Sequence, residues 1–224
     1  MTKPPPVPTL RARPARPRPA QRPPAGSREA SPFAFLLEWP GDATGPGLLA
    51  RAALLALLAL WTVSFLRAGL DAERLMGSFL HLVNLPFHEA GHVFFSPFGR
   101  FLTVLGGSLF QVAVPLLCAG VFLVKNRDPF AASVATWWAG ESLLDLAPYV
   151  ADARALALPL LGGRTGAEVE GHDWEYLLTT LGLLGRDVAL GRATFAAGAL
   201  LMVASIAWGG GALWRKRACL REAP

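Results

Sequence analysis

Three stretches of the chain are almost entirely apolar, and each is long enough to cross a lipid bilayer. They are residues 47–69, 101–124 and 193–214, and the last two contain no charged residue. A membrane-crossing helix needs about 20 mostly apolar residues. Arg51 lies near one end of the first stretch, where its long side chain can reach the membrane surface. The pattern therefore predicts an integral, multi-pass membrane protein.

Two further stretches, 75–97 and 129–150, are long enough to span but are interrupted by polar residues. A charge at membrane depth is costly and normally faces the protein interior or a water-filled cavity. Residues 176–190 form a shorter helical pattern, typical of an interfacial segment, a re-entrant segment or a poor span. We therefore predict an all-α, polytopic membrane helical bundle of five or six spans.

The two ends of the chain differ in composition from the middle. The first 30 residues hold seven basic residues, one acidic residue and nine of the 19 prolines. Such a segment cannot bury apolar surface, so residues 1–32 are predicted to form a disordered basic tail. Residues 33–214 form the predicted membrane domain and 215–224 a basic C-terminal tail. No aromatic residue interleaves with the arginines of the first tail, so lipid is expected there and not nucleic acid.

These charges also bear on orientation. Basic segments stay on the cytoplasmic side of a membrane, which predicts a cytoplasmic N-terminus, in the cell membrane. With five spans, the basic C-terminal tail would then lie outside, against the same rule. Six crossings, or one re-entrant segment, would restore it.

The chemistry-bearing motif is HEAGH, residues 88–92, inside the interrupted stretch 75–97. His88 and His92 are four residues apart, so on a helix they project from one face and can both bind one Zn²⁺. Glu89 lies beside such a metal, where it can take a proton from a water molecule that the metal acidifies. His81 lies on the same face two turns earlier and is expected to support the site without binding the metal.

A catalytic zinc site has three protein ligands and one open position. Pro148 is expected to break the helix before Asp152, and unwound backbone at membrane depth is tolerated only where it lines a protein cavity. This favours Asp152 as the third ligand. For Asp173, the sequence GHDWEYLL favours the start of a helix instead. The candidates left open are Glu141, Asp145, His172 and Asp173.

HEAGH in a membrane segment, followed by a downstream aspartate near a proline, resembles the site-2 protease family of intramembrane zinc metalloproteases. The resemblance implies that His88 and His92 are zinc ligands, Glu89 the catalytic base and Asp152 the aspartate ligand, with Pro148 as the motif proline. GGSLFQ, residues 106–111, is similar to a further Gly-rich motif of that family. The family's asparagine is Asp145 here, the interval from proline to aspartate is one residue shorter, and Ala153 replaces the following glycine.

These features predict a zinc-dependent metalloendopeptidase that hydrolyses peptide bonds of membrane-embedded or juxtamembrane protein substrates. The alternative is a catalytically inactive membrane adaptor or scaffold that keeps the metal as a clamp, for which a closed site of four ligands would be expected. A metal transporter would need ligands distributed along a path through several spans, whereas the sequence offers one cluster. The presence of Glu89 favours the enzyme.

Overall fold

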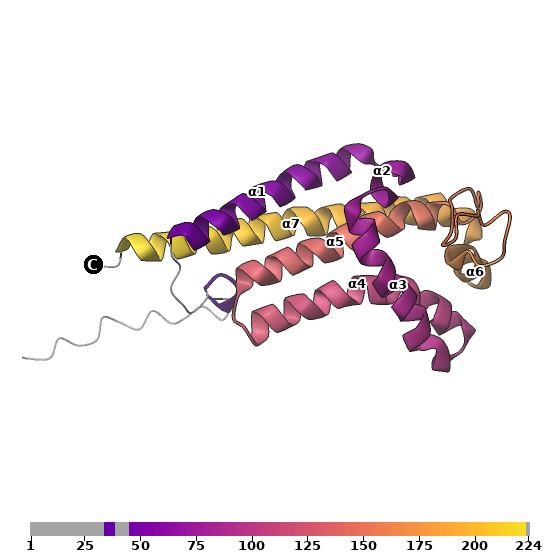
Figure 1. The fold of residues 1–224 in the computed structure, drawn as a ribbon, viewed down its shortest axis with the longest axis horizontal. Coiled ribbons are helices and arrows are strands. Elements are labelled where there is room, and N and C mark those ends of the chain that lie inside the picture. Colours follow the sequence, from indigo (N-terminus) through magenta and orange to yellow (C-terminus); the bar gives the residue numbers. More distant parts are fainter. Residues whose placement is uncertain (1–33, 39–44, 223–224) are drawn as a thin grey trace, which may run out of the picture. The chain divides into compact units, whose positions relative to one another are not determined.

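The structure is a computed structural model that describes residues 34–38 and 45–222, and the predicted disordered tail of residues 1–32 lies outside them. The described part is all-helical apart from turns and one isolated bridge between Pro159 and Thr165. Figure 1 labels the α-helices, which are α1 (Gly45–Ala68), α2 (Ala72–Met76), α3 (Phe79–Phe95), α4 (Arg100–Val124), α5 (Pro129–Ala151), α6 (Asp173–Thr180) and α7 (Asp187–Glu222). Single 3-10 turns lie at Ala34–Leu36, Ser96–Phe98 and Leu184–Arg186.

Three of the helices are long and apolar enough to cross a membrane: α1, α4 and the segment Leu184–Leu220, which contains most of α7. Their outward faces carry many exposed leucine and valine side chains, which suits contact with lipid. This agrees with a membrane protein and with three of the predicted spans. The predicted total of five or six spans is not confirmed.

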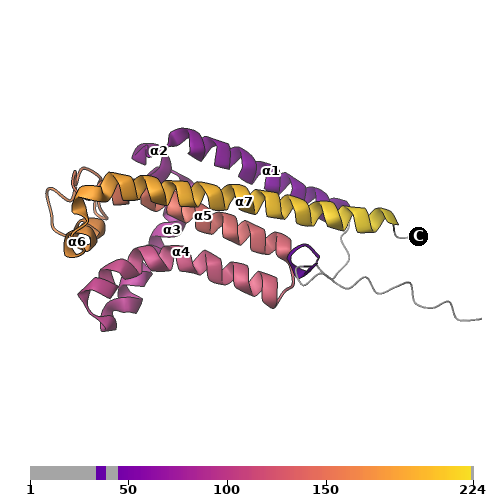
Figure 2. The same ribbon diagram turned by 180° about the vertical axis from the view of Figure 1, so that it is seen from behind.

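The most buried helix is α5, although it carries Glu141 and Asp145. It packs along α7, and Figures 1 and 2 show the two helices side by side from opposite directions. Small residues permit the close approach, because a Cβ on Gly140 would collide with Met202, and one on Gly198 would collide with Leu144. The helix continues through Pro148 and ends at Ala151, so the expected break comes within one turn after the proline. The charges of α5 are therefore covered by protein.

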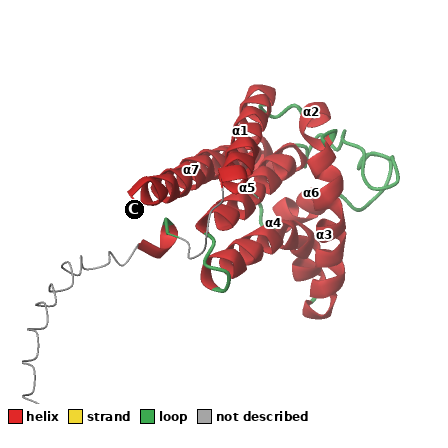
Figure 3. Cartoon of the chain, turned by 60° about the vertical axis from the view of Figure 1, so that its left-hand side comes forward, coloured by secondary structure: helices red, strands yellow, loops and turns green. Residues whose placement is uncertain are grey.

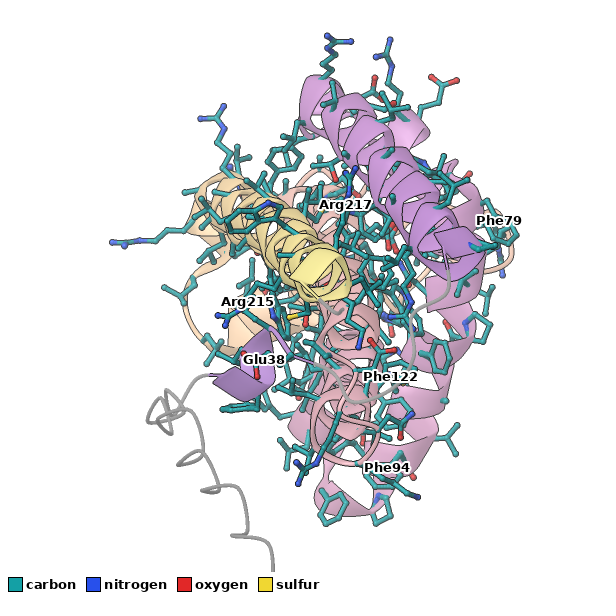
Figure 4. The ribbon with its side chains drawn as sticks, turned by 90° about the vertical axis from the view of Figure 1, so that its left-hand side faces the viewer. Glu38, Phe79, Phe94, Phe122, Arg215 and Arg217 are labelled. Carbon is teal, nitrogen blue, oxygen red and sulfur yellow. The ribbon has the colours of Figure 1, made fainter. Side chains whose placement is uncertain are left out.

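Ion pairs mark the two ends of the bundle. At one end Arg51 of α1 binds Asp128, which precedes α5, through two 2.9 Å hydrogen bonds. Arg215 of α7 binds Glu38 at 2.8 Å at this end as well, and Figure 4 shows these two side chains together. At the other end Arg154 binds Asp187 at 2.8 Å. The start of α1, the α4–α5 turn and the end of α7 thus lie together, and the α5–α6 connection lies at the opposite end (Figure 1).

Helix α3 differs from the long helices in its course. Its second turn contacts the middle of α5, where Asn84 donates a 2.9 Å hydrogen bond to Glu141. Its last turns contact the beginning of α4, and Figure 3 shows α3 and α4 beside each other near α6. Helix α1 ends at the α6 end of the bundle, and α4 begins at that same end. Because α3 lies between them in the chain, it starts and finishes near one end of the bundle. It does not run the length of the bundle.

Candidate metal centre

His88 and His92 occupy consecutive turns of α3, and their ring centroids are 4.9 Å apart. Both Nε2 atoms approach one carboxylate oxygen, Oδ2 of Asp173, at 3.0 Å from His88 and 3.3 Å from His92. Asp173 is the first residue of α6 and therefore comes from a distant part of the chain. The structure thus brings together the two predicted histidine ligands and one of the carboxylates that the sequence left open.

The geometry of this group fits a divalent cation. Bonds of 2.0–2.2 Å to a tetrahedral zinc place neighbouring ligand atoms about 3.3 Å apart, which matches the two nitrogen–oxygen distances above. The three ligand atoms all lie within 4.8 Å of one another. Two imidazole nitrogens and a carboxylate oxygen suit zinc and other borderline divalent ions, so the donor set is not specific to zinc.

The hydrogen-bond partners of the Nδ1 atoms indicate that Nδ1 of each histidine carries a proton. Nδ1 of His92 lies 2.9 Å from the backbone carbonyl of Thr103, which can only accept, so this nitrogen donates. Nδ1 of His88 lies 2.9 Å from Oε1 of Gln111. In this structure each Nε2 donates to Asp173. Because each Nδ1 also has an acceptor, a ring that gives up its Nε2 proton keeps the Nδ1 proton and offers the Nε2 lone pair to a metal. Metal-ligating histidines are usually held in this way.

Gly107 of α4 leaves space next to both imidazoles. A Cβ at this position would lie 2.5 Å from Nε2 of His92 and 2.6 Å from Nε2 of His88, closer than real contacts allow. Gly91 and Gly106 lie where α3 and α4 meet, and a Cβ on either would overlap the other residue's carbonyl oxygen. The close approach of α3 and α4 therefore requires glycine, and Gly107 keeps the region around the ligand nitrogens clear.

Asp173 is held by its neighbours on α5 and α6. Its backbone N–H donates to the hydroxyl of Tyr149 at 2.9 Å, and the preceding His172 caps α6 by accepting from the N–H of Glu175 at 3.2 Å. Burial alone would raise the pKa of Asp173, but its contacts with His88 and His92 outweigh burial and hold the pKa below its ordinary range. The carboxylate is therefore charged at neutral pH.

The structure does not bring Asp152 to the imidazoles. Its two oxygens instead accept from the backbone N–H groups of Ala157 and Leu158, at 3.1 and 3.0 Å. Nε2 of the buried His172 lies 3.5 Å from Oδ2 of Asp152 and has no hydrogen-bond partner among the described residues. Burial lowers the pKa of His172, so the ring is neutral; its Nδ1 accepts, and its Nε2–H is directed toward Asp152. Asp152 thus holds the connection that leads to Asp173.

Glu89 lies at the same cavity as the three candidate ligands. The cavity has a volume of about 660 Å³ and is covered by part of the α5–α6 connection, including residues 159–162. Its wall is lined by apolar side chains such as Leu85 and Leu146 and by polar ones such as Tyr149.

Thr103 and Tyr149 also belong to this site, although the sequence does not mark them as functional. Thr103 acts through its backbone carbonyl, which leaves no signal in a pattern of chemical groups. Gly107 lies in GGSLFQ, the Gly-rich stretch that the sequence does single out. Comparison with protein-family models, curated proteins and solved structures finds no match. The function is therefore argued from the chemistry of the residues.

Proposed function

We propose that the chain is an intramembrane zinc metallopeptidase that hydrolyses peptide bonds of membrane-embedded or juxtamembrane proteins. The observation that carries the proposal is the convergence of His88, His92 and Asp173 beside Glu89 in one cavity. Asp173 takes the role that the sequence suggested for Asp152, because its carboxylate faces both imidazoles.

The candidate ligands and Glu89 have different roles in this proposal. His88, His92 and Asp173 would hold the cation, which when bound supplies Lewis-acid chemistry that polarises a carbonyl and makes water more acidic. Glu89 takes a proton from the attacking water and delivers it to the leaving amine. The walls of the cavity hold the substrate backbone in an extended form, since a helix hides its peptide bonds.

The number of ligands favours an enzyme over an inactive adaptor. Among the described residues the candidate group holds three protein ligands, and a structural zinc site is normally closed by four. A cavity adjoins the group, which leaves an open position accessible. Glu89 also has no use in a purely structural site.

The decisive experiment compares the purified wild type with Glu89→Gln. We expect equal zinc content in both proteins, and cleavage of a panel of membrane-protein substrates by the wild type alone. Glu175→Gln is the matched control, because Glu175 lies on α6 next to the site but does not line the cavity. Zinc in all three proteins and cleavage by none would favour the adaptor.

We also propose a topology. Helices α1, α4, α5 and α7 cross the bilayer, and α3 enters and leaves it on one side. The 23 residues of α5 span about 35 Å, enough to cross, and its charges are shielded by neighbouring helices. Four crossings place both basic termini on the same side, the cytoplasmic side of the cell membrane, in agreement with the positive-inside rule.

Cys219 provides the test of this topology, because it is exposed near the basic C-terminal end of α7. In a Cys118→Ser background, a membrane-impermeant maleimide should label Cys219 in inverted vesicles and not in intact cells. Labelling in intact cells alone would contradict the proposed side of the C-terminus.

A further inference from the structure

Asp145 lies on α5 and lines the same cavity as the candidate ligands, and a single side chain joins its carboxylate to one of them. Asp145 is only 5% exposed. Its Oδ2 accepts from Nε2 of Gln111 at 2.9 Å and from Nδ2 of Asn84 at 3.3 Å. Its Oδ1 lies 2.8 Å from Nδ1 of His81. Donors from α3 and α4 therefore converge on both of its oxygens.

Gln111 connects this carboxylate to the metal centre. Its NH₂ group faces Asp145, and its Oε1 lies 2.9 Å from Nδ1 of His88. An ionised carboxylate only accepts hydrogen bonds. If the amide turned over, its oxygen would face a carboxylate oxygen and its NH₂ group would face the N–H of His88. Asp145 thus fixes which end of Gln111 faces the histidine.

We propose that Asp145 is a positioning residue that acts through Gln111. Held by Asp145, the amide oxygen of Gln111 accepts from Nδ1–H of His88, which fixes the ring and leaves Nε2 as the atom that would bind a metal. His92 receives the same constraint from the backbone carbonyl of Thr103, which no substitution removes. The inference rests on the proposed metal site, but it does not depend on peptide hydrolysis.

Glu141 offers a matched control one helical turn before Asp145. It lies on the same helix, is 2% exposed, and accepts a 2.9 Å hydrogen bond from Asn84. Asn84 joins it to Asp145, but no hydrogen bond between Glu141 and Gln111 or His88 is found among the described residues. Loss of a buried carboxyl group from α5 is common to Glu141→Gln and Asp145→Asn, whereas loss of the acceptor that orients Gln111 belongs to Asp145→Asn alone.

The first measurement is metal affinity of the full chain in detergent, with Co²⁺ absorption and Zn²⁺ competition. We expect Asp145→Asn to weaken binding by about 10- to 100-fold, the usual effect of losing the hydrogen-bond partner of a ligand. Glu141→Gln should stay close to the wild type. Equal affinity of Asp145→Asn and the wild type would overturn the inference.

The second measurement is the Nδ1–H signal of His88 in the Zn²⁺-loaded protein, from ¹⁵N-labelled histidine. The wild type should show a slowly exchanging proton bound to Gln111, and Asp145→Asn a faster-exchanging one, because Gln111 is then free to turn over. Glu141→Gln should resemble the wild type. Metal binding without hydrolysis would contradict the proposed function and leave this test standing.

The third measurement exchanges the carboxylate of residue 145 and the amide of residue 111. Gln111→Glu alone places two carboxylates where atoms lie 2.9 Å apart, and should weaken binding. Gln111→Glu combined with Asp145→Asn restores an acceptor for His88 and a donor for residue 111. We expect the double variant to recover the metal affinity and the slow exchange of the Nδ1 proton, which a purely structural role of Asp145 does not predict. A double variant no better than Asp145→Asn would overturn the inference.

Discussion

Helix α3 and the segment of residues 152–173 both contribute to the candidate metal centre, but they depend on different kinds of interaction. On α3, His88 and His92 face the same way because one helical turn separates them, so their relation is set locally. Asp173 reaches them only because the connection after α5 folds back over the cavity. That course depends on Asp152, Tyr149 and the cap formed by His172.

This difference has a consequence for sensitivity. The relation between the two imidazoles survives any change that leaves α3 helical and packed on α4. The position of Asp173 depends on a chain of single hydrogen bonds, each worth about 1 kcal/mol. Metal affinity should therefore respond to changes in residues 152–172, which lie outside the helices that carry the other ligands.

The largest effect is expected for Asp173→Ala. It removes the one carboxylate that, among residues 34–38 and 45–222, faces both imidazoles, so metal affinity should fall by more than the ~100-fold typical for a partner of a ligand. Zinc content and Co²⁺ titration measure the loss. If Asp152→Ala abolished binding and Asp173→Ala did not, the assignment would return to the ligand predicted from the sequence.

The next largest effect is expected for Gly107→Ala. The added methyl group would lie against Nε2 of both His88 and His92, in the space that a cation needs. Metal affinity should fall by at least tenfold, since the imidazoles must move apart or the site be filled.

Gly120→Ala on the same helix is the control, because a Cβ there meets nothing within 4 Å. It should leave metal affinity unchanged. Equal affinity of Gly107→Ala and Gly120→Ala would show that the cation does not lie between these nitrogens.

A smaller effect is expected for Asp152→Asn. The amide oxygen can accept one of the two backbone N–H groups, but the NH₂ group cannot accept the other. Loss of one hydrogen bond of about 1 kcal/mol weakens metal binding by up to about tenfold. The same titration measures it, and protease nicking between residues 156 and 171 should increase in parallel. A loss of metal affinity as large as that of Asp173→Ala would contradict the interpretation that Asp152 only holds the α5–α6 connection in place.

The smallest effect on metal affinity is expected for Asp128→Asn, which lies far from both α3 and the segment of residues 152–173. Asparagine still caps α5 but loses the ion pair with Arg51, so stability should fall by about 0.5–1 kcal/mol with metal affinity unchanged. Burial would raise the pKa of Asp128, but the hydrogen bond from Arg51 helps to hold it below the ordinary value.

The sign of the pH dependence follows. A depressed pKa in the folded state stabilises the fold fully above the unfolded value of about 3.9, and this contribution is lost as the pH falls through the folded-state pKa. Unfolding in SDS at several pH values should therefore separate Asp128→Asn from the wild type at neutral pH, with the difference disappearing in acid. A constant difference at all pH values would contradict the ion-pair explanation.

The sequence allowed some of this to be predicted, and the reasons are physical. Long apolar stretches revealed α1, α4 and α7, because contact with lipid demands apolar residues along the whole helix. The shared orientation of His88 and His92 could be predicted, because residues four apart on a helix project from the same face. The candidate third ligand could not be predicted, because the proximity of Asp173 to the imidazoles depends on how the chain folds after α5. The contacts that join Asp145 to His88 through Gln111 could not be predicted, because they depend on how three helices pack together.

The length of α7 has a consequence for depth. From Asp187 to Arg215 the helix rises about 42 Å, close to the 40–45 Å thickness of a bilayer with its headgroups. In the proposed topology the Arg154–Asp187 and Arg215–Glu38 pairs would therefore belong to opposite headgroup layers. Asp152 and Asp173 would then lie near the first of these layers, and water would enter the cavity from that face. A scissile bond would meet Glu89 close to that surface and not at the bilayer midplane.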